Sequence, residues 1–512
     1  MATAEGTIAI TLSRSIKPSG TGCVSLRHLL ATLTLWLGGS QLLLWRFLDI
    51  APWWAYALGL SGLIALCVGI IRLVPDTPDN RIGVRLIGIC LLVAFLLMLL
   101  GGQGRFLYAN IDWQVRYAVL RDMAINPWPF VYTARATPDV LRAPIGMFLA
   151  PALAFKALSP RAGDIALLIQ NSALLGVILA IASRLFGSTR ARVWGLLVFL
   201  AFSGLDAAGS LFVHGALSDH LENWAQIQYS SMITLAFWVP HHAMTAWIGA
   251  ILFLLWRTER LPLSVFLAIL PLTMLWSPFG LLGTLPFVAL AGFETLIQRR
   301  LRVSDIALPA LALLLCVPGL LYLSAAGDDV GIRLYAPGTL RYVIFHLFET
   351  VPYLVPVAFL VRGTRFGWPV FAVVTACLLL MPFIQIGWSI DFMMRASVPA
   401  LTILMVMVAD AVTPGDLGAP APIRYWLLFA LIIGSITGQH EIRRALTQPP
   451  APEVRCTFWK AWDQSFADFP KGSYLAPLSA MPAAVSPRHP ARASAIEPDR
   501  CWTGDWYRQA GK

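Results

Sequence analysis

The sequence predicts an all-α polytopic membrane protein with about thirteen transmembrane helices, an outer loop that forms an interfacial helix, and a short extramembrane C-terminal tail. Two observations lead to this prediction. The 512-residue chain is 58% hydrophobic and only 13% charged, with a mean hydropathy of +0.70. Long apolar runs also recur from about residue 29 to about residue 440, which is far more apolar sequence than a soluble core needs.

The expected spans are the apolar windows long enough to cross the hydrocarbon core. They lie at 29–48, 53–73, 84–101, 163–186, 193–213, 240–256, 263–276, 279–297, 306–325, 341–361, 368–387, 397–412 and 424–440. Because no small-residue cleavage pattern closely follows the first window, we expect it to be retained rather than removed as a signal. Residues 144–158 are short, and they suit a re-entrant or interfacial helix as well as a span.

The positions of Arg and Lys predict the orientation. If residues 144–158 do not cross, one side of the membrane holds nearly all the basic loops: Arg14, Lys17, Arg27; Arg72, Arg81, Arg85; Arg190, Arg192; Arg257, Arg260; Arg299, Arg300, Arg302; Arg362, Arg365. The positive-inside rule makes that side the cytoplasm. The net charge of +11 then reflects this bias, and with no nucleic-acid motif we expect no nucleic-acid partner.

Three regions follow from this orientation. Residues 1–28 form a cytoplasmic N-terminal segment, residues 29–440 form the transmembrane bundle, and residues 441–512 form a periplasmic tail. The outer loops are 102–143, 210–239, 326–340 and 388–396, and these loops hold eight of the 27 acidic residues. The compact loops and the basic composition favour a bacterial inner membrane as the location.

The cysteines divide into two groups. Five lie in or next to apolar helices, whereas Cys456 and Cys501 both lie in the tail. An oxidising periplasm would favour a disulfide between these two, and two free thiols are the alternative.

The first outer loop concentrates charge in an apolar chain. Asp112 and Arg116 are four residues apart, hence on one face of a helix over 111–124, and Arg121 and Asp122 follow. The aromatic and aliphatic residues between them predict an amphipathic helix on the membrane surface. Asp112 and Arg116 are then either site residues or a solvated pair.

The second and third outer loops add further charged and imidazole groups. Asp219, His220 and Glu222 could orient a substrate or hold a divalent metal, although their spacing fits no dedicated zinc motif, and a polar loop cap is the alternative. A doubled histidine after Pro240 can donate to a phosphate at a helix start. An arginine at the outer end of a helix can bind the phosphate oxygens of a pyrophosphate through its guanidinium group. Alternatively, it forms an ion pair with an acidic residue four positions earlier. These candidates are His241, His242, Asp391 and Arg395.

In this arrangement the chain resembles the GT-C-type integral-membrane glycosyltransferases, which use polyprenyl-phosphate-linked sugars. The resemblance covers the architecture of residues 29–440. Asp112 matches the early acidic position of that family, His241 or His242 a basic position, and Arg395 in DFMMRASVPAL a later arginine. The chain departs from the family in two ways. The catalytic loop of that family usually follows the first span, whereas here two further spans come before the loop 102–143. The family's large soluble C-terminal domain is absent or reduced to the tail.

The function expected from the residues and the resemblance is transfer of a sugar from a polyprenyl-phosphate donor to a glycan, lipid or protein acceptor on the periplasmic face. Asp112 would be the general base, and Arg395 with His241 or His242 would stabilise the departing phosphate. Two alternatives remain. One is a polysaccharide polymerase or ligase, and the other is a transporter or flippase of lipid-linked glycans, for which the sequence offers little mid-span charge and no clear repeat.

Overall fold

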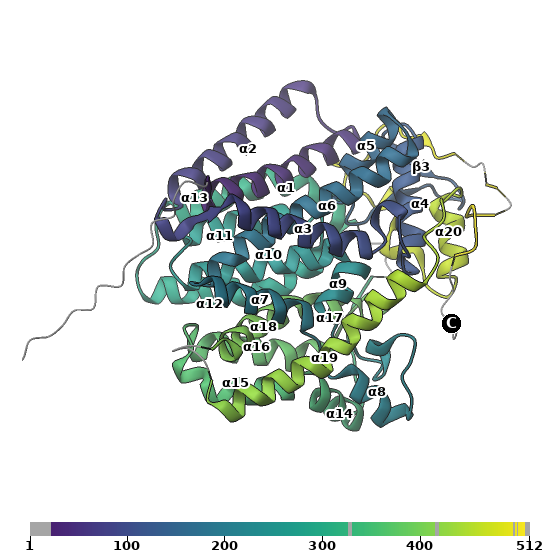
Figure 1. Cartoon of the computed structure of the whole chain (residues 1–512). Helices are drawn as coiled ribbons and strands as arrows, with labels where there is room; N and C mark the ends of the chain where they lie inside the picture. Colours follow the sequence, from purple (N-terminus) through teal and green to yellow (C-terminus); the bar gives the residue numbers. More distant parts are fainter. Residues whose placement is uncertain (1–21, 326–329, 415–418, 495–496, 499, 507–512) are drawn as a thin grey trace, which may run out of the picture.

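The structure, a computed structural model, is a bundle of helices capped at one end by loop and tail segments (Figure 1). It describes residues 22–325, 330–414, 419–494, 497–498 and 500–506. The helices are α1 (Leu26–Leu48), α2 (Trp53–Leu73), α3 (Val84–Leu100), α4 (Asp112–Ile125), α5 (Leu149–Ala157), α6 (Pro160–Ala182), α7 (Thr189–Ala201), α8 (Asp206–His214), α9 (Met232–Trp238), α10 (Pro240–Arg257), α11 (Leu263–Ile269), α12 (Pro278–Ile297), α13 (Ser304–Ser324), α14 (Thr339–Glu349), α15 (Val351–Leu360), α16 (Gly367–Leu380), α17 (Asp391–Ala396), α18 (Val398–Val412), α19 (Ala421–Thr447) and α20 (Phe458–Ser465). The strands are β1 (Cys23–Ser25), β2 (Arg81–Gly83), β3 (Phe130–Tyr132), β4 (Asp139–Leu141), β5 (Ile332–Leu334), β6 (Ile384–Ile386), β7 (Leu475–Pro477) and β8 (Ala491–Arg492).

The helices confirm a multi-pass membrane architecture but not the predicted number of spans. Within the described residues, seven helices are long and apolar enough to cross a membrane, or eight if α14 and α15, bent by 60°, form one span. The prediction of about thirteen is therefore too high by this measure. Three of the predicted windows fold as helices of 10–17 residues. In two of them Pro271 and Pro382 mark the change from α-helix to a tighter 3-10 turn, as expected for a residue without a backbone N–H.

The ambiguous segment 144–158 contains only the nine-residue helix α5, which is too short to cross the hydrocarbon core. Ser159 ends this segment by capping α6, since its hydroxyl accepts a hydrogen bond from the Ala162 backbone N–H, and Pro160 occupies the first turn. The chain therefore turns from α5 directly into α6, and the two helices pack against each other. This favours the re-entrant or interfacial alternative.

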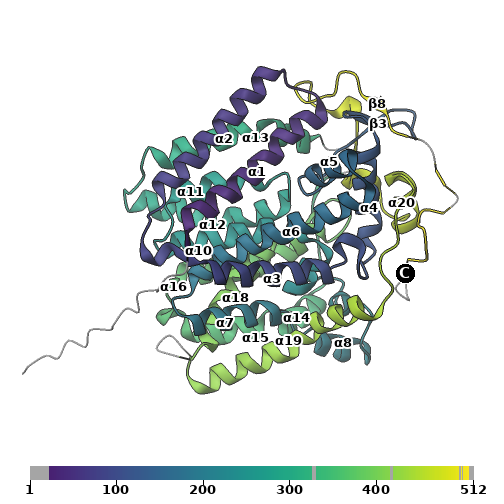
Figure 2. The same cartoon turned by 45° about the horizontal axis from the view of Figure 1, so that its top comes forward.

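Helix α4 begins within one residue of its predicted start, but it is not a surface helix. Most of its side chains are buried, including Trp113, Arg116 and Asp122. The reason is that α5 packs on one side of α4 and α20 of the tail packs on the other. Figure 2 shows the tail passing over α4 at this end of the bundle. Of the two alternatives for Asp112 and Arg116, the solvated ion pair does not fit, because the Arg116 side chain is only 3% exposed.

The tail is not a simple appendage, and the fold is not purely helical. Four short strands form one sheet in the order β7-β4-β3-β8, which joins the first outer loop to the tail. Val140 pairs with Ala476 in an antiparallel ladder, and Phe130 pairs with Ala491 in a parallel one. Because they are hydrogen-bonded neighbours, the loop 102–143 and the tail lie on the same side of the bundle.

A disulfide links Cys456 and Cys501, the pairing that the sequence favours. It lies within the capping region, where the backbone N–H of Arg455 also donates to the carbonyl of Cys501 at 2.7 Å. The disulfide thereby holds together two segments of the tail that are 45 residues apart in the sequence.

Candidate functional site

Three segments that are distant in the sequence meet at the capped end of the bundle. They are α4 with Asp112 and Arg116, the start of α10 with His241 and His242, and α17 with Asp391 and Arg395. The charges of Arg116 and Arg395 both act on the two histidines, and α17 packs against both α10 and α12. We call Arg116, His241, His242 and Arg395 the basic cluster.

Arg116 is the residue that α4 contributes to the basic cluster, and its side chain is deeply buried. Its side chain is 3% exposed and its Nη2 donates to Oδ2 of Asp112 at 2.7 Å, while Asp112 is 23% exposed. The other terminal nitrogen, Nη1, donates to the carbonyl of Trp238. Asp112 and Arg116 therefore form the i,i+4 ion pair expected from the sequence. The arginine of this pair is buried, whereas the aspartate is partly exposed. Nε of Arg116 is buried without a hydrogen-bond partner among the described residues.

The two histidines occupy the first turn of α10, directly after Pro240. Their ring centroids lie 4.0 Å apart. Nδ1 of His242 is 2.6 Å from Oγ of Ser277, the residue that caps α12 by accepting from the Gly280 N–H at 2.9 Å. His242 is thus fixed by a neighbouring helix start, whereas Nδ1 of His241 is buried with no partner in the described part of the chain.

Helix α17 presents Arg395 to the same region. Nη1 of Arg395 is 2.8 Å from Oδ1 of Asp391, and the side chains are 14% and 37% exposed. Gly283 of α12 lies directly against the backbone of Ala396, so there is no room for a side chain at this crossing. Nε of Arg395, like that of Arg116, is buried and makes no hydrogen bond to any described residue.

Three buried nitrogens of the basic cluster have no hydrogen-bond partner among the described residues: Nε of Arg116, Nε of Arg395 and Nδ1 of His241. Leaving such donors unpaired is costly, and a phosphate oxygen is a natural acceptor for guanidinium N–H groups. Asp112 and Asp391 flank this cluster and orient its arginines through the two ion pairs. The arrangement therefore combines buried cationic groups that can donate hydrogen bonds to the oxygens of an anion with a partly exposed carboxylate.

Tyr474 of the tail also approaches the basic cluster, although no motif in the sequence singles it out. Arg116, Asp112 and Arg395 all act on its hydroxyl, whose pKa is raised by burial. Its position is fixed by the Arg142 backbone N–H, which donates to the Tyr474 carbonyl at 2.7 Å, and by the ring of Phe458, 5.3 Å away. The tail therefore contributes a hydroxyl group to the edge of the site.

Arg121 and Asp122 lie on a different face of α4 and do not join the basic cluster. Asp122 is fully buried and accepts hydrogen bonds from the Phe458 backbone N–H at 2.7 Å and from the Tyr132 hydroxyl at 2.8 Å. Arg121 pairs with Asp122 at 3.2 Å and donates to the carbonyl of Cys456. Burial raises the pKa of Asp122 to about 7. In the structure these two residues attach the tail to α4.

Asp219, His220 and Glu222 do not converge as a metal site. Asp219 is exposed, and the His220 ring stacks on Trp238 with centroids 4.8 Å apart. The Glu222 carboxylate instead accepts from the Gln228 amide and the Ser231 backbone N–H, both at 2.8 Å. Burial and then the charge of Asp206 raise the pKa of Glu222. Across the described residues, no group of three or more His, Cys, Asp or Glu side chains is arranged to hold a metal ion.

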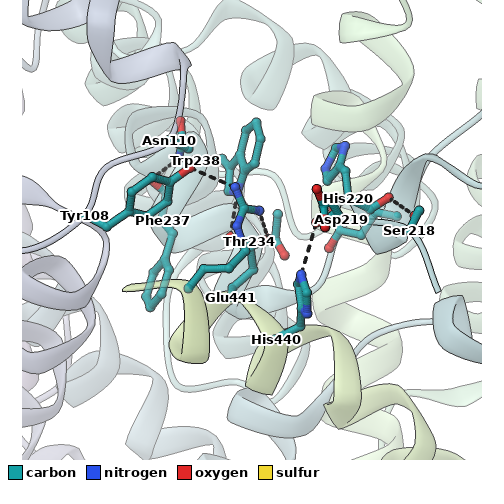
Figure 3. Close-up of polar contacts among 12 residues, drawn as sticks. Tyr108, Asn110, Ser218, Asp219, His220, Thr234, Phe237, Trp238, His440 and Glu441 are labelled. Atoms are coloured by element: carbon teal, nitrogen blue, oxygen red, sulfur yellow. Dashed lines mark hydrogen bonds and ion pairs between the residues drawn. The ribbon is translucent and has the colours of Figure 1, made fainter. Parts of the chain in front are cut away.

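Trp238 connects this second loop to the basic cluster. Its carbonyl accepts a hydrogen bond from Nη1 of Arg116, and its Nε1 donates a hydrogen bond to Oε2 of Glu441 at 2.9 Å. Figure 3 shows Tyr108 and Asn110 on one side of this region and Asp219 and His220 on the other, with α19 beneath them. Arg444 of α19 pairs with Glu441 at 2.9 Å. A Trp backbone carbonyl carries no sequence signal, so this connection was not predicted.

Comparison with protein-family models, with curated proteins and with solved structures finds no match for this chain.

Proposed function

We propose that the protein is a membrane glycosyltransferase that moves a sugar from a polyprenyl-phosphate donor to a glycan, lipid or protein acceptor on the periplasmic face of a bacterial inner membrane. The observation that supports it most is the convergence of Arg116, His241 and Arg395, whose buried nitrogens have no acceptors among the described residues, beside the carboxylate of Asp112.

The basic cluster would bind the phosphate of the donor lipid. As the glycosidic bond breaks, negative charge accumulates on the departing phosphate, and fixed cationic donors stabilise that charge in the transition state. Arg116 and Arg395 remain protonated at neutral pH, so they can act without a proton transfer. His241 and His242 would add imidazole contacts from the N-terminal turn of α10, where the helix dipole also favours an anion.

Asp112 would be the general base. Its ion pair with Arg116 at 2.7 Å fixes the orientation of the carboxylate beside the basic cluster. Its exposed fraction of 23% leaves the side chain accessible to an acceptor hydroxyl. The carboxylate would take the hydroxyl proton as the oxygen attacks the anomeric carbon, and the lipid phosphate would leave with the bonding electrons.

The remaining predicted residues would act around this centre. Asp391 would orient Arg395 through their ion pair, and Asp219 and His220, next to Trp238, would contact the acceptor. Arg121, Asp122 and Glu222 would serve indirectly, by holding the tail and the second outer loop in place.

Binding of the donor lipid tests the proposal. Removal of the guanidinium in Arg395→Ala should weaken binding of polyprenyl phosphate to the purified protein, and Arg395→Lys should restore only part of it, because an ammonium does not reproduce the planar fork. Arg333→Gln is a suitable control, since Arg333 is exposed and stacks on Trp388. Equal binding by the wild-type and Arg395→Ala proteins would contradict the assignment.

A polysaccharide polymerase or ligase would need the same phosphate contacts, so the identity of the acceptor distinguishes it from the leading proposal.

A transporter or flippase is favoured by a different observation. Asp206 and Glu349, on helices of the candidate spans, are 0% and 4% exposed, and one carboxylate oxygen of each is buried without a hydrogen-bond partner among the described residues. Buried acids in spans often serve ion-coupled transport. Glu349→Gln should then abolish lipid translocation in proteoliposomes, whereas a transferase should retain its activity.

A further inference from the structure

A second cavity lies away from the basic cluster, between the end of α8, the loop 224–226 and the start of α14. Its volume is about 600 Å³, within the range typical of ligand sites. None of the residues that line it belongs to α4, α10 or α17. A ligand bound here would therefore be distinct from one bound at the basic cluster.

The walls of the cavity are mainly apolar, with Val213, Leu340 and Ile344 among them. Trp224 also lines the cavity, is 3% exposed, and is held by two contacts. Its Nε1 donates to Oε1 of Glu349 at 3.2 Å, and its carbonyl lies 3.0 Å from Nε2 of His214. The cavity is thus bounded by a fixed aromatic surface, and water gains little in a space with so few polar partners.

The outer surface around the cavity is also apolar. Leu211 and Phe212 on α8 are 51% and 66% exposed, and Leu340 and Leu347 on α14 are 73% and 52% exposed. Both helices belong to segments long and apolar enough to lie in a membrane. Side chains of this kind are stable when they face lipid, so the bilayer is the natural source of an occupant.

An arginine side chain lines this cavity. Arg341, in the first turn of α14, lines the cavity and is exposed. It has no ion pair with any carboxylate that the structure describes. A guanidinium close to the membrane surface attracts an anionic headgroup and can bind phosphate oxygens through two N–H groups.

We propose that this cavity binds a phospholipid with an anionic headgroup from the surrounding leaflet. Its acyl chain would lie along the apolar wall formed by Val213, Trp224 and Ile344, and its phosphate would contact Arg341. This proposal does not depend on the glycosyltransferase assignment.

Native mass spectrometry of the full-length protein, released from membranes and supplied with phosphatidylglycerol or phosphatidylcholine, tests this proposal. We expect the wild-type protein to retain phosphatidylglycerol preferentially. Arg341→Gln should reduce that retention about fivefold, the order expected for one arginine near an anionic membrane surface. Arg333→Gln, which alters an exposed arginine outside the cavity lining, should leave it unchanged.

Ala225→Trp, and independently Ile344→Trp, would fill the cavity and should remove retention of both lipids. An intact disulfide between Cys456 and Cys501 and an unchanged elution volume would show which filled variant is folded. Equal retention of the two lipids by the wild-type protein, or unchanged retention in Arg341→Gln and in a folded filled variant, would overturn the proposal. Displacement of phosphatidylglycerol by equimolar polyprenyl phosphate would also overturn it, because the site would then belong to the donor.

Discussion

Asp122 should make the attachment of the tail to α4 depend on pH. Its carboxyl is fully buried, and burial raises its pKa from 3.8 to about 7, with the nearby charge of Glu497 adding to the rise. The hydrogen bonds from Phe458 and Tyr132 and the charge of Arg121 lower the pKa of Asp122, but the effect of burial is larger. The folded state therefore favours the protonated carboxyl more than the unfolded state does.

The sign and size of the effect follow from this difference. The folded state binds more protons between pH 3.8 and about 7, so its stability is greatest below pH 3.8 and falls as the pH rises through that window. Between pH 5.5 and pH 7.5 the loss is about 2 kcal/mol, or about 25-fold in the opening equilibrium of the tail. Hydrogen exchange of α20 amides at pH 5.5 and 7.5, corrected for the intrinsic rate, measures this change.

Asp122→Asn isolates the contribution of this carboxyl. The amide can still accept a hydrogen bond from the Phe458 N–H but does not titrate, so the pH dependence of α20 protection should largely disappear. Asp463→Asn is the matched control, because Asp463 is 51% exposed and pairs with Lys471. Undiminished pH dependence in Asp122→Asn, or stronger protection of the wild-type tail at pH 7.5 than at pH 5.5, would refute the reasoning.

Three further predictions concern the tail, the topology and the placement of α17. Loss of the Cys456–Cys501 disulfide, which closes a separation of 45 residues, should destabilise the tail by about 4 kcal/mol; two free thiols in non-reduced protein by mass spectrometry would exclude the bond. Probe cysteines replacing Ala134 and Ala484, both exposed, should be labelled from outside intact cells, and labelling only after lysis would reverse the topology. Gly283→Ala should displace α17 at a cost of about 1–3 kcal/mol and weaken donor binding, whereas Gly292→Ala on the same helix, with open space around it, should do neither; equal behaviour of the two variants would argue against this crossing as the support of Arg395.

The sequence predicts the features of this protein that depend on local pattern. The boundaries of α4 and the i,i+4 pairs of Asp112 with Arg116 and Asp391 with Arg395 follow from helical spacing. The location of Cys456 and Cys501 outside the apolar windows was enough to favour their pairing.

The features that were missed depend on contacts between distant segments. Burial of α4 requires the tail to fold over it, and the sheet joins Phe130 to Ala491 through strands of only two or three residues. Strands this short have no readable alternation. The burial of both Asp206 and Glu349 was also missed, because each acid appears alone in its segment of the sequence.

The most direct test of the proposed function is sugar transfer by Asp112→Asn in membranes supplied with a polyprenyl-phosphate sugar. The amide keeps the size of the side chain but cannot accept a proton at neutral pH. We therefore expect transfer to fall by at least about a hundredfold, while binding of polyprenyl phosphate, measured on the same preparation, is largely retained. Near-normal transfer by this variant would contradict the assignment of Asp112 as the base and the central claim that the basic cluster and this carboxylate form a glycosyltransferase site.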